Sequence, residues 1–223
     1  PLAFCLSGGV DSAALASIAS KEFGAKVTTF SIIDSDQRYN EEDNIMATAR
    51  DIGCEYHLIS ASQEDPLTRL TKLIQYHDAP IATISYFVHS MISETISNNG
   101  FKVSVSGTSA DELFTGYYDH FLLHLNEMRS SDEYNNYLKD WSRDIRPHIR
   151  NTDLRSPNLY HQKPSFRDHI FDASNQINEY FLEPFKEEYT EEYFTGNFLR
   201  NRMFNELFHE ITPVILHEDD LNS

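Results

Sequence analysis

The most informative stretch of this sequence is Ser7-Gly8-Gly9-Val10-Asp11-Ser12. It lies between a short apolar run, 2–6, and an alanine-rich segment, 13–21, so the predicted order is strand, glycine turn and helix. The two glycines allow the backbone to turn tightly and to approach a ligand closely. Because the first amides of a helix are unpaired and carry partial positive charge, the turn favours a bound anion.

Asp11 is the exception in this loop, since a carboxylate repels a bare phosphate. A divalent cation between the carboxylate and the phosphate oxygens removes that conflict. No lysine follows the glycines, which excludes a Walker-type loop. We interpret the stretch as a loop for the pyrophosphate end of ATP, bound with the help of Mg²⁺. Taken alone, a Ser-Gly-Gly turn between a strand and a helix is equally well explained as ordinary loop chemistry.

Composition limits the class of protein. The 223 residues are 40% hydrophobic and 13% aromatic, enough for one sizeable domain with a helical extension. The formal net charge of −17 argues against nucleic acid as a partner, because phosphate contacts need lysine and arginine. The apolar runs are too short to cross a membrane. Cys5 and Cys54 form neither a disulfide framework nor a metal pattern, so we expect a cytoplasmic protein.

Strand and helix patterns alternate in the first half of the chain. Strands are expected near 2–6, 25–33, 55–60 and 101–105, and helices near 13–21, 40–53, 65–78 and 85–98. This alternation predicts parallel strands with helices on both faces, a doubly wound, Rossmann-like α/β sheet over residues 1–118. Ligands bind such sheets beyond the carboxyl ends of the strands, where the strand order reverses.

Strand patterns stop at residue 119, and only helical patterns follow. Helices are expected at 121–128, 134–141, 170–185 and 189–211. Residues 119–223 are therefore predicted to form a helical annex of the same domain. The first and last residues read as internal sequence, so we expect the chain to be an excerpt of a longer protein.

A second group of small and acidic residues follows the fourth expected strand, Ser106-Gly107-Thr108-Ser109-Ala110-Asp111-Glu112. Alone, it is well explained as a helix cap, with Thr108 or Ser109 as the capping residue. Together with the first loop it places Asp11 and Asp111 at strand ends that can face each other. Mg²⁺ bound to phosphates usually takes one or two carboxylates, so we expect these two to share one ion.

The two groups together resemble a known family. The first loop matches the SGGxDS pyrophosphate loop of the N-type ATP pyrophosphatases. The second, continued through Gly116-Tyr117, is similar to the SGEGxDExFxGY pattern in the synthetase domain of glutamine-dependent asparagine synthetases. The resemblance implies a fold of the adenine nucleotide alpha hydrolase type. It also implies ATP-dependent activation of a carboxylate, aspartate in that family, as an acyl-adenylate that ammonia converts to an amide.

The resemblance also implies roles for single residues. Pyrophosphate is expected to bind Ser7, Gly8, Gly9 and Ser12, and Mg²⁺ is expected to bind Asp11 and Asp111. The nucleoside is expected at Cys5, Ile32, Ser106 and Gly107, and Tyr117 is expected on the acceptor side. Ammonia is expected from a glutaminase domain outside this chain. The lysine that binds the α-phosphate is expected downstream of the last residue, and assembly as a homodimer is left open.

Two departures from the family pattern concern the acceptor. The glutamate that follows Ser-Gly is Thr108 here, and the glutamate of an Asp-Glu-Pro element is Ala79. A sugar uronic acid in polysaccharide synthesis is therefore an alternative acceptor, and a non-catalytic nucleotide-binding module an alternative function. His120 and His124, four apart on an expected helix, have the spacing of a metal pair, but packing is favoured because the sequence offers no third ligand nearby.

Overall fold

The structure is a computed structural model that describes residues 2–61, 65–81, 83–171, 174–184 and 189–222. The chain divides into two compact units. The first comprises Pro1–Thr108 and Pro213–Ser223, and the second comprises Ser109–Thr212. The predicted boundary lay at 118, whereas the structure divides the chain after Thr108 and returns its last segment to the first unit.

The first unit is built on a parallel sheet of four strands in the order β3-β2-β1-β4. The strands are β1 Ala3–Cys5, β2 Thr28–Ile33, β3 Glu55–Ser60 and β4 Ser104–Val105. Ala3 of β1 lies opposite Thr28 on one side and Ser104 on the other, so the first strand is central. This confirms the predicted α/β sheet.

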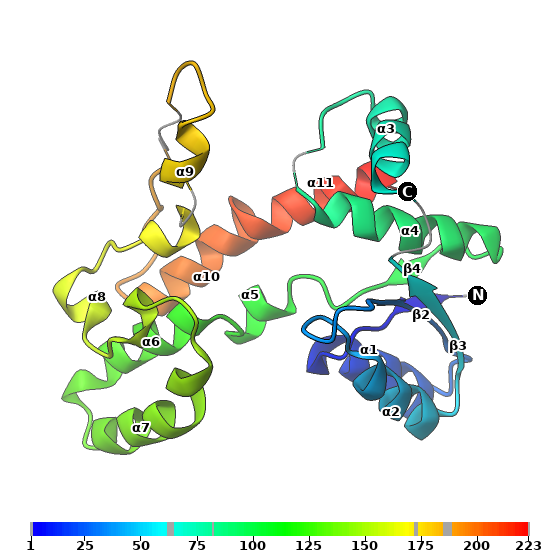
Figure 1. The fold of residues 1–223 in the computed structure, drawn as a ribbon. Coiled ribbons are helices and arrows are strands. Elements are labelled where there is room, and N and C mark those ends of the chain that lie inside the picture. Colours follow the sequence, from blue (N-terminus) through cyan, green and yellow to red (C-terminus); the bar gives the residue numbers. More distant parts are fainter. Residues whose placement is uncertain (1, 62–64, 82, 172–173, 185–188, 223) are drawn as a thin grey trace. The chain divides into compact units, whose positions relative to one another are not determined.

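Helices cover both faces of this sheet (Figure 1). They are α1 Val10–Lys21, α2 Glu42–Ile52, α3 Pro66–His77 and α4 Ser85–Asn98. Successive residues of β1 point to opposite faces. Ala3 belongs to the core under α3 and α4, and Phe4 belongs to the core under α1. Neighbouring residues of the strand therefore pack against helices on opposite faces of the sheet, as in a doubly wound fold.

The first unit is completed by the end of the chain. Helix α11, Ile211–Asn222, packs its last turns beside α3 and α4. The Glu218 carboxylate accepts a hydrogen bond from Ser85 Oγ at 2.7 Å and lies 2.7 Å from His89 Nδ1. The Asn222 amide donates to the Tyr86 carbonyl oxygen at 3.3 Å. These polar contacts hold the terminal helix against the outer layer of the sheet.

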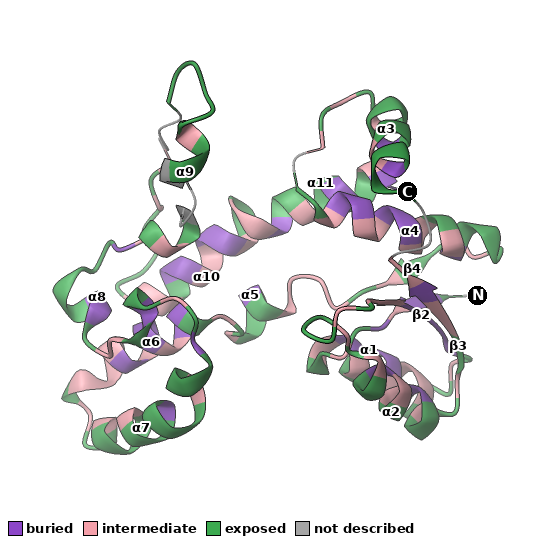
Figure 2. Cartoon of the chain, in the orientation of Figure 1, coloured by how far each residue is buried: buried purple, intermediate pink, exposed green. Residues whose placement is uncertain are grey.

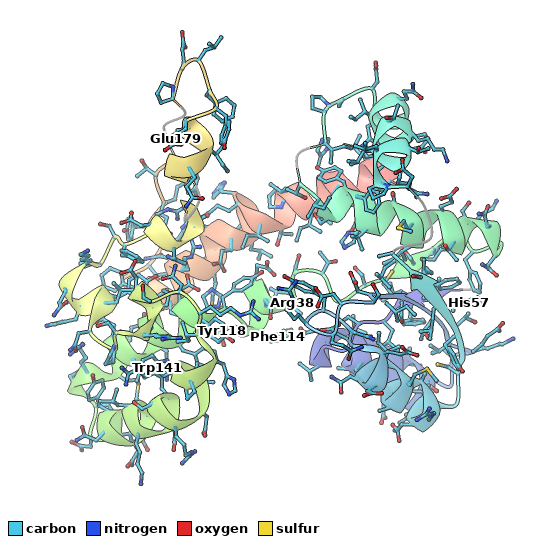
Figure 3. The ribbon with its side chains drawn as sticks, viewed as in Figure 1. Arg38, His57, Phe114, Tyr118, Trp141 and Glu179 are labelled. Atoms are coloured by element: carbon cyan, nitrogen blue, oxygen red, sulfur yellow. The ribbon has the colours of Figure 1, made fainter. Side chains whose placement is uncertain are left out.

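The second unit is helical, as predicted. Its helices are α5 Ala110–Phe114, α6 Tyr118–Glu127, α7 Tyr134–Asp140, α8 Leu159–Gln162, α9 Ser174–Asn178 and α10 Phe198–Phe208. Its core joins buried leucines of α6 to Trp141, Ile149 and Tyr160. Figure 2 shows this buried stripe along α6, and Figure 3 labels Trp141 just after α7. None of the helices that the structure describes has the length and apolar character needed to cross a bilayer.

Two of the predicted helices in this unit are wrong in extent. The region 170–185 contains a short 3₁₀ turn and α9, and its residues 172–173 and 185 lie outside the described part. The helix predicted for 189–211 begins only at Phe198. Segment 189–195 is irregular because two buried asparagines of α10 bind its backbone. Asn205 Oδ1 accepts from Glu192 N, and Asn201 Oδ1 accepts from Phe194 N, each at 2.9 Å.

Candidate functional site

The loop Ser7–Gly9 leaves the carboxyl end of the central strand β1 and leads directly into α1. From β1 the chain moves to β2 and then β3 on one side, whereas β4 lies on the other side. The strand order therefore reverses between β1 and β4. This is the point at which open α/β sheets form a ligand crevice. The loops that follow these two strands are the two that the sequence singled out.

The two loops are in close contact within the first unit. A Cβ atom added at Gly107 would lie 3.0 Å from the backbone nitrogen of Ser12 and 3.2 Å from the Cβ of Asp11. Only glycine fits this approach without displacement of the facing backbone. The expected meeting of Ser106-Gly107 with the start of α1 is thus present, and it brings Asp11 to the same edge.

Hydrogen bonds inside the first loop set its shape. Ser12, which is buried, accepts from Ser7 N at 3.0 Å, and its hydroxyl lies 3.0 Å from Ser7 Oγ. Ser7 Oγ accepts from Gly9 N at 3.2 Å. Beside this loop, Ser106 Oγ lies 2.7 Å from Thr108 Oγ1. The hydroxyls of Ser7 and Ser12 are therefore close to the backbone amides that the sequence assigned to anion binding.

Glu41 is a member of this site that sequence reasoning missed. Its carboxylate oxygen Oε2 accepts a hydrogen bond from Gly8 N at 2.8 Å. A Cβ added at Gly8 would lie 2.7 Å from the Cβ of Glu41, so the glutamate side chain lies directly against the glycine. A carboxylate of the chain itself is thus bound by the loop, which shows that this amide is placed to receive an anionic oxygen. The only sequence signal was its place at the start of α2.

Cys5 and Ile32 lie at the carboxyl ends of β1 and β2. Both pack partly against the core under α3 and α4. Burial raises the pKa of the Cys5 thiol from 9.0 to about 11, and the negative charge of Asp219 adds to the effect. Cys5 is therefore a neutral thiol at physiological pH, which fits a role through its backbone rather than as a nucleophile.

Asp111 and Tyr117 belong to the second unit. Asp111 is exposed on α5, and Ser109 precedes that helix with a φ of 69°. Ser109 makes no side-chain capping bond; its hydroxyl lies 3.0 Å from Thr212 Oγ1 instead. Capping by Ser109, one of the two residues that the sequence offered for this role, therefore lacks its hydrogen bond.

The Tyr117 hydroxyl donates to Oε1 of the buried Glu112 at 2.6 Å. Burial, together with this hydrogen bond, raises the pKa of Tyr117 well above its ordinary value. The hydroxyl is neutral at physiological pH and acts as a donor.

A group of buried charges lies next to Tyr117. Ligand atoms of Asp119, His120 and Glu206 all fall within 4.8 Å of one another, a spacing that a metal ion could use. The guanidinium of Arg202 already bridges the two carboxylates, at 3.2 Å from Asp119 Oδ2 and 2.9 Å from Glu206 Oε1. We interpret the group as an ion-pair network in which arginine supplies the positive charge. His124 has a packing role, edge-on to Tyr137.

Comparison with known proteins identifies the family. The profile of the family described as "Asparagine synthase" matches residues 1–209. The chain belongs to the asparagine synthase family. This agrees with the family indicated by the two loops.

The proteins that the chain resembles carry different names. The chain is 35% identical over 121 residues to asparagine synthetase (glutamine-hydrolyzing) 1 of Bacillus subtilis, covering 52% of this chain and 18% of that protein. It is 24% identical over 131 residues to amidase chyE of Penicillium rubens, covering 52% and 20%. It is 26% identical over 131 residues to amidase chry2 of Gibberella zeae, again covering 52% and 20%. The alignments thus span about a fifth of the relatives' own length.

Proposed function

We propose that this chain carries the nucleotide-binding part of an ATP-dependent, amide-forming ligase of the asparagine synthetase type. The observation that supports it most is the contact of Gly107 with Asp11 and Ser12, because it joins the two family loops at the reversal of strand order. Membership of the asparagine synthase family agrees with this assignment.

The residues at the loops fit a magnesium–triphosphate complex. Gly8 N binds a carboxylate oxygen at 2.8 Å, so its amide is oriented toward an anion. In the proposal, the pyrophosphate end of ATP is bound by Ser7, Gly8, Gly9 and Ser12. Mg²⁺ is held by Asp11 and Asp111. The nucleoside contacts the backbones of Cys5 and Ile32 together with Ser106 and Gly107, and the acceptor side is lined by Tyr117. When bound, the ion neutralises the charge that develops on the departing pyrophosphate.

The chain's own contribution to this chemistry is binding and orientation. A carboxylate oxygen of the acceptor attacks the α-phosphorus, and the bond from phosphorus to the departing pyrophosphate breaks. Ammonia then attacks the acyl carbon, and AMP leaves as the amide forms. The loop amides and the hydroxyls of Ser7 and Ser12 hold the pyrophosphate as its charge increases, and preorganised donors of this kind stabilise developing charge.

Aspartate is the proposed acceptor, with ammonia from a glutaminase domain outside this chain, in a cytoplasmic enzyme of amino-acid biosynthesis. Thr108 and Ala79 stand where the family pattern has glutamates, and two relatives are named as amidases. These observations favour a second candidate, in which the same chemistry acts on another carboxylate such as a sugar uronic acid.

The test is ATP–pyrophosphate exchange in the complete protein with a panel of carboxylate acceptors. We expect exchange that depends on one acceptor, and we expect Asp11→Asn and Asp111→Asn each to reduce it about 100-fold or more. Asp132→Asn is the matched control, since Asp132 is exposed and lies outside both loops. Full exchange in either loop variant would show that the metal assignment is wrong. Tight ATP binding without AMP formation, whatever the acceptor, would favour a non-catalytic module.

A further inference from the structure

Glu41 lies outside the loop Ser7–Gly9 in sequence but binds to it through its side chain. It lies on the connection between β2 and α2, and its carboxylate reaches Gly8, 33 residues earlier in the chain. Arg38 on the same connection, labelled in Figure 3, pairs with Asp36 at 2.6 Å. The cation nearest in sequence is thus bound to a different carboxylate. Glu41 brings a full negative charge to the amide assigned to a phosphate oxygen.

The three amides of the loop have different kinds of acceptor. Ser7 N donates to Ser12 Oγ and Gly9 N donates to Ser7 Oγ, which are neutral hydroxyls within the loop. Gly8 N donates to the carboxylate of Glu41. A hydroxyl can remain beside a phosphate, because it can donate its own hydrogen. The Glu41 carboxylate and a phosphate oxygen cannot share the Gly8 amide, because both are only acceptors and their charges repel when no cation lies between them.

The backbone of Glu41 is fixed, whereas its side chain lies at the surface. Its carbonyl oxygen accepts from the amides of Asn44 and Ile45, both at 3.1 Å, and Ile45 is buried in the core. Glu41 itself is exposed. Rotation of one surface side chain therefore suffices to open the Gly8 amide, with no change in the fold of α2.

We propose that Glu41 is a built-in competitor for the polyphosphate of ATP. The inference rests on the proposed function, since it assumes that the loop binds pyrophosphate. The Glu41 carboxylate holds the Gly8 amide in the orientation that a phosphate oxygen needs. The incoming phosphate displaces it, so that affinity for polyphosphate is lowered while affinity for the nucleoside is unchanged.

The test is calorimetric titration of the complete protein with magnesium pyrophosphate, ATP and adenosine. We expect Glu41→Gln and Glu41→Ala to bind pyrophosphate about five- to tenfold more tightly than the wild type, which corresponds to the net contribution of one typical hydrogen bond. Adenosine affinity stays unchanged. Asp43→Asn is the matched control, because it removes the same charge from the first turn of α2 and leaves Gly8 bound to Glu41.

The outcomes separate this inference from the proposed function. Unchanged or weaker pyrophosphate binding in both Glu41 variants overturns the competitor role and leaves the nucleotide site standing. Equal tightening in Asp43→Asn also overturns it, because the effect would then follow from net charge. Failure of the wild type and of every variant to bind either ATP or pyrophosphate overturns both.

Discussion

Replacement of Asp119 by asparagine should change how the stability of the second unit depends on pH. Asp119 lies in the first turn of α6 with 3% exposure, and its Oδ2 is 3.3 Å from His169 Nε2 and 3.2 Å from Arg202 Nε. Burial alone raises the pKa of this carboxyl. The hydrogen bond from His169 and the charges of Arg202 and His120 outweigh burial and bring the pKa from 3.8 to about 2.

The direction in which stability changes with pH follows from the pKa of Asp119 in the folded and in the unfolded chain. The folded pKa of Asp119 lies below the unfolded value, so the unfolded chain takes up the proton first as the pH falls. The difference corresponds to roughly 2 kcal/mol of stability, at about 1.4 kcal/mol for each pKa unit. That contribution is present above about pH 5, and about half of it is lost by pH 3. Burial raises the pKa of Glu206, which acts in the opposite direction, and the charge of Asp119 adds to that rise, so Asp119→Asn also brings the pKa of Glu206 closer to its ordinary value.

The assay is urea unfolding followed by the fluorescence of Trp141, the single tryptophan, which lies in the core of the second unit. We expect Asp119→Asn to be less stable than the wild type at pH 6, and the gap to narrow by about 1 kcal/mol at pH 3. The exposed control Asp132→Asn should track the wild type at both pH values. A gap between wild type and Asp119→Asn that stays constant, or widens, from pH 6 to pH 3 would refute the assignment of Asp119 as an ionised, buried partner.

Three further substitutions test other parts of the structure. Gly107→Ala places a Cβ 3.0 Å from Ser12 N, so we expect ATP binding to weaken about tenfold, with a stability cost of about 1–3 kcal/mol; unchanged calorimetric affinity would contradict the loop contact. Phe30→Ala removes a fully buried ring from the sheet and should cost about 3–5 kcal/mol in thermal or urea unfolding, whereas a loss below about 1 kcal/mol would contradict its core position. Arg202→Leu removes the buried guanidinium that Asp119 and Glu206 share, and Trp141 fluorescence should report a loss of about 3–5 kcal/mol.

The first unit could be predicted closely from the sequence because its signals are local. The strand Glu55–Ser60 and the helix Ser85–Asn98 match the expected bounds, since each has its own hydrophobic period and stop signals. The pairing of Ser106-Gly107 with the first loop also followed from rules for parallel sheets. Glu41 could not be found in this way, because its contact with Gly8 depends on the path of a connection without periodicity.

The second unit was harder to predict because tertiary contacts override local preference there. Aromatic residues at 189–198 have helical spacing, yet their backbone binds to Asn201 and Asn205 instead of to itself. Asparagines with an exposed fraction of 2% or less are unusual, and nothing in their sequence neighbourhood reveals what they bind. The ion pair of Arg202 with Asp119 likewise has no local signal, since the two residues are 83 positions apart in the chain.

The hydrogen-bond distance between the hydroxyls of Ser109 and Thr212 has a practical consequence for dissecting this protein. These are the first and last residues of the second unit, so that unit is an insertion whose two ends touch. A short glycine-serine bridge from residue 108 to residue 213 could replace all of it. A simple truncation at 108 would instead discard α11 and remove the hydrogen bonds of Ser85 to Glu218 and of Tyr86 to Asn222, so splicing is the route to an isolated first unit.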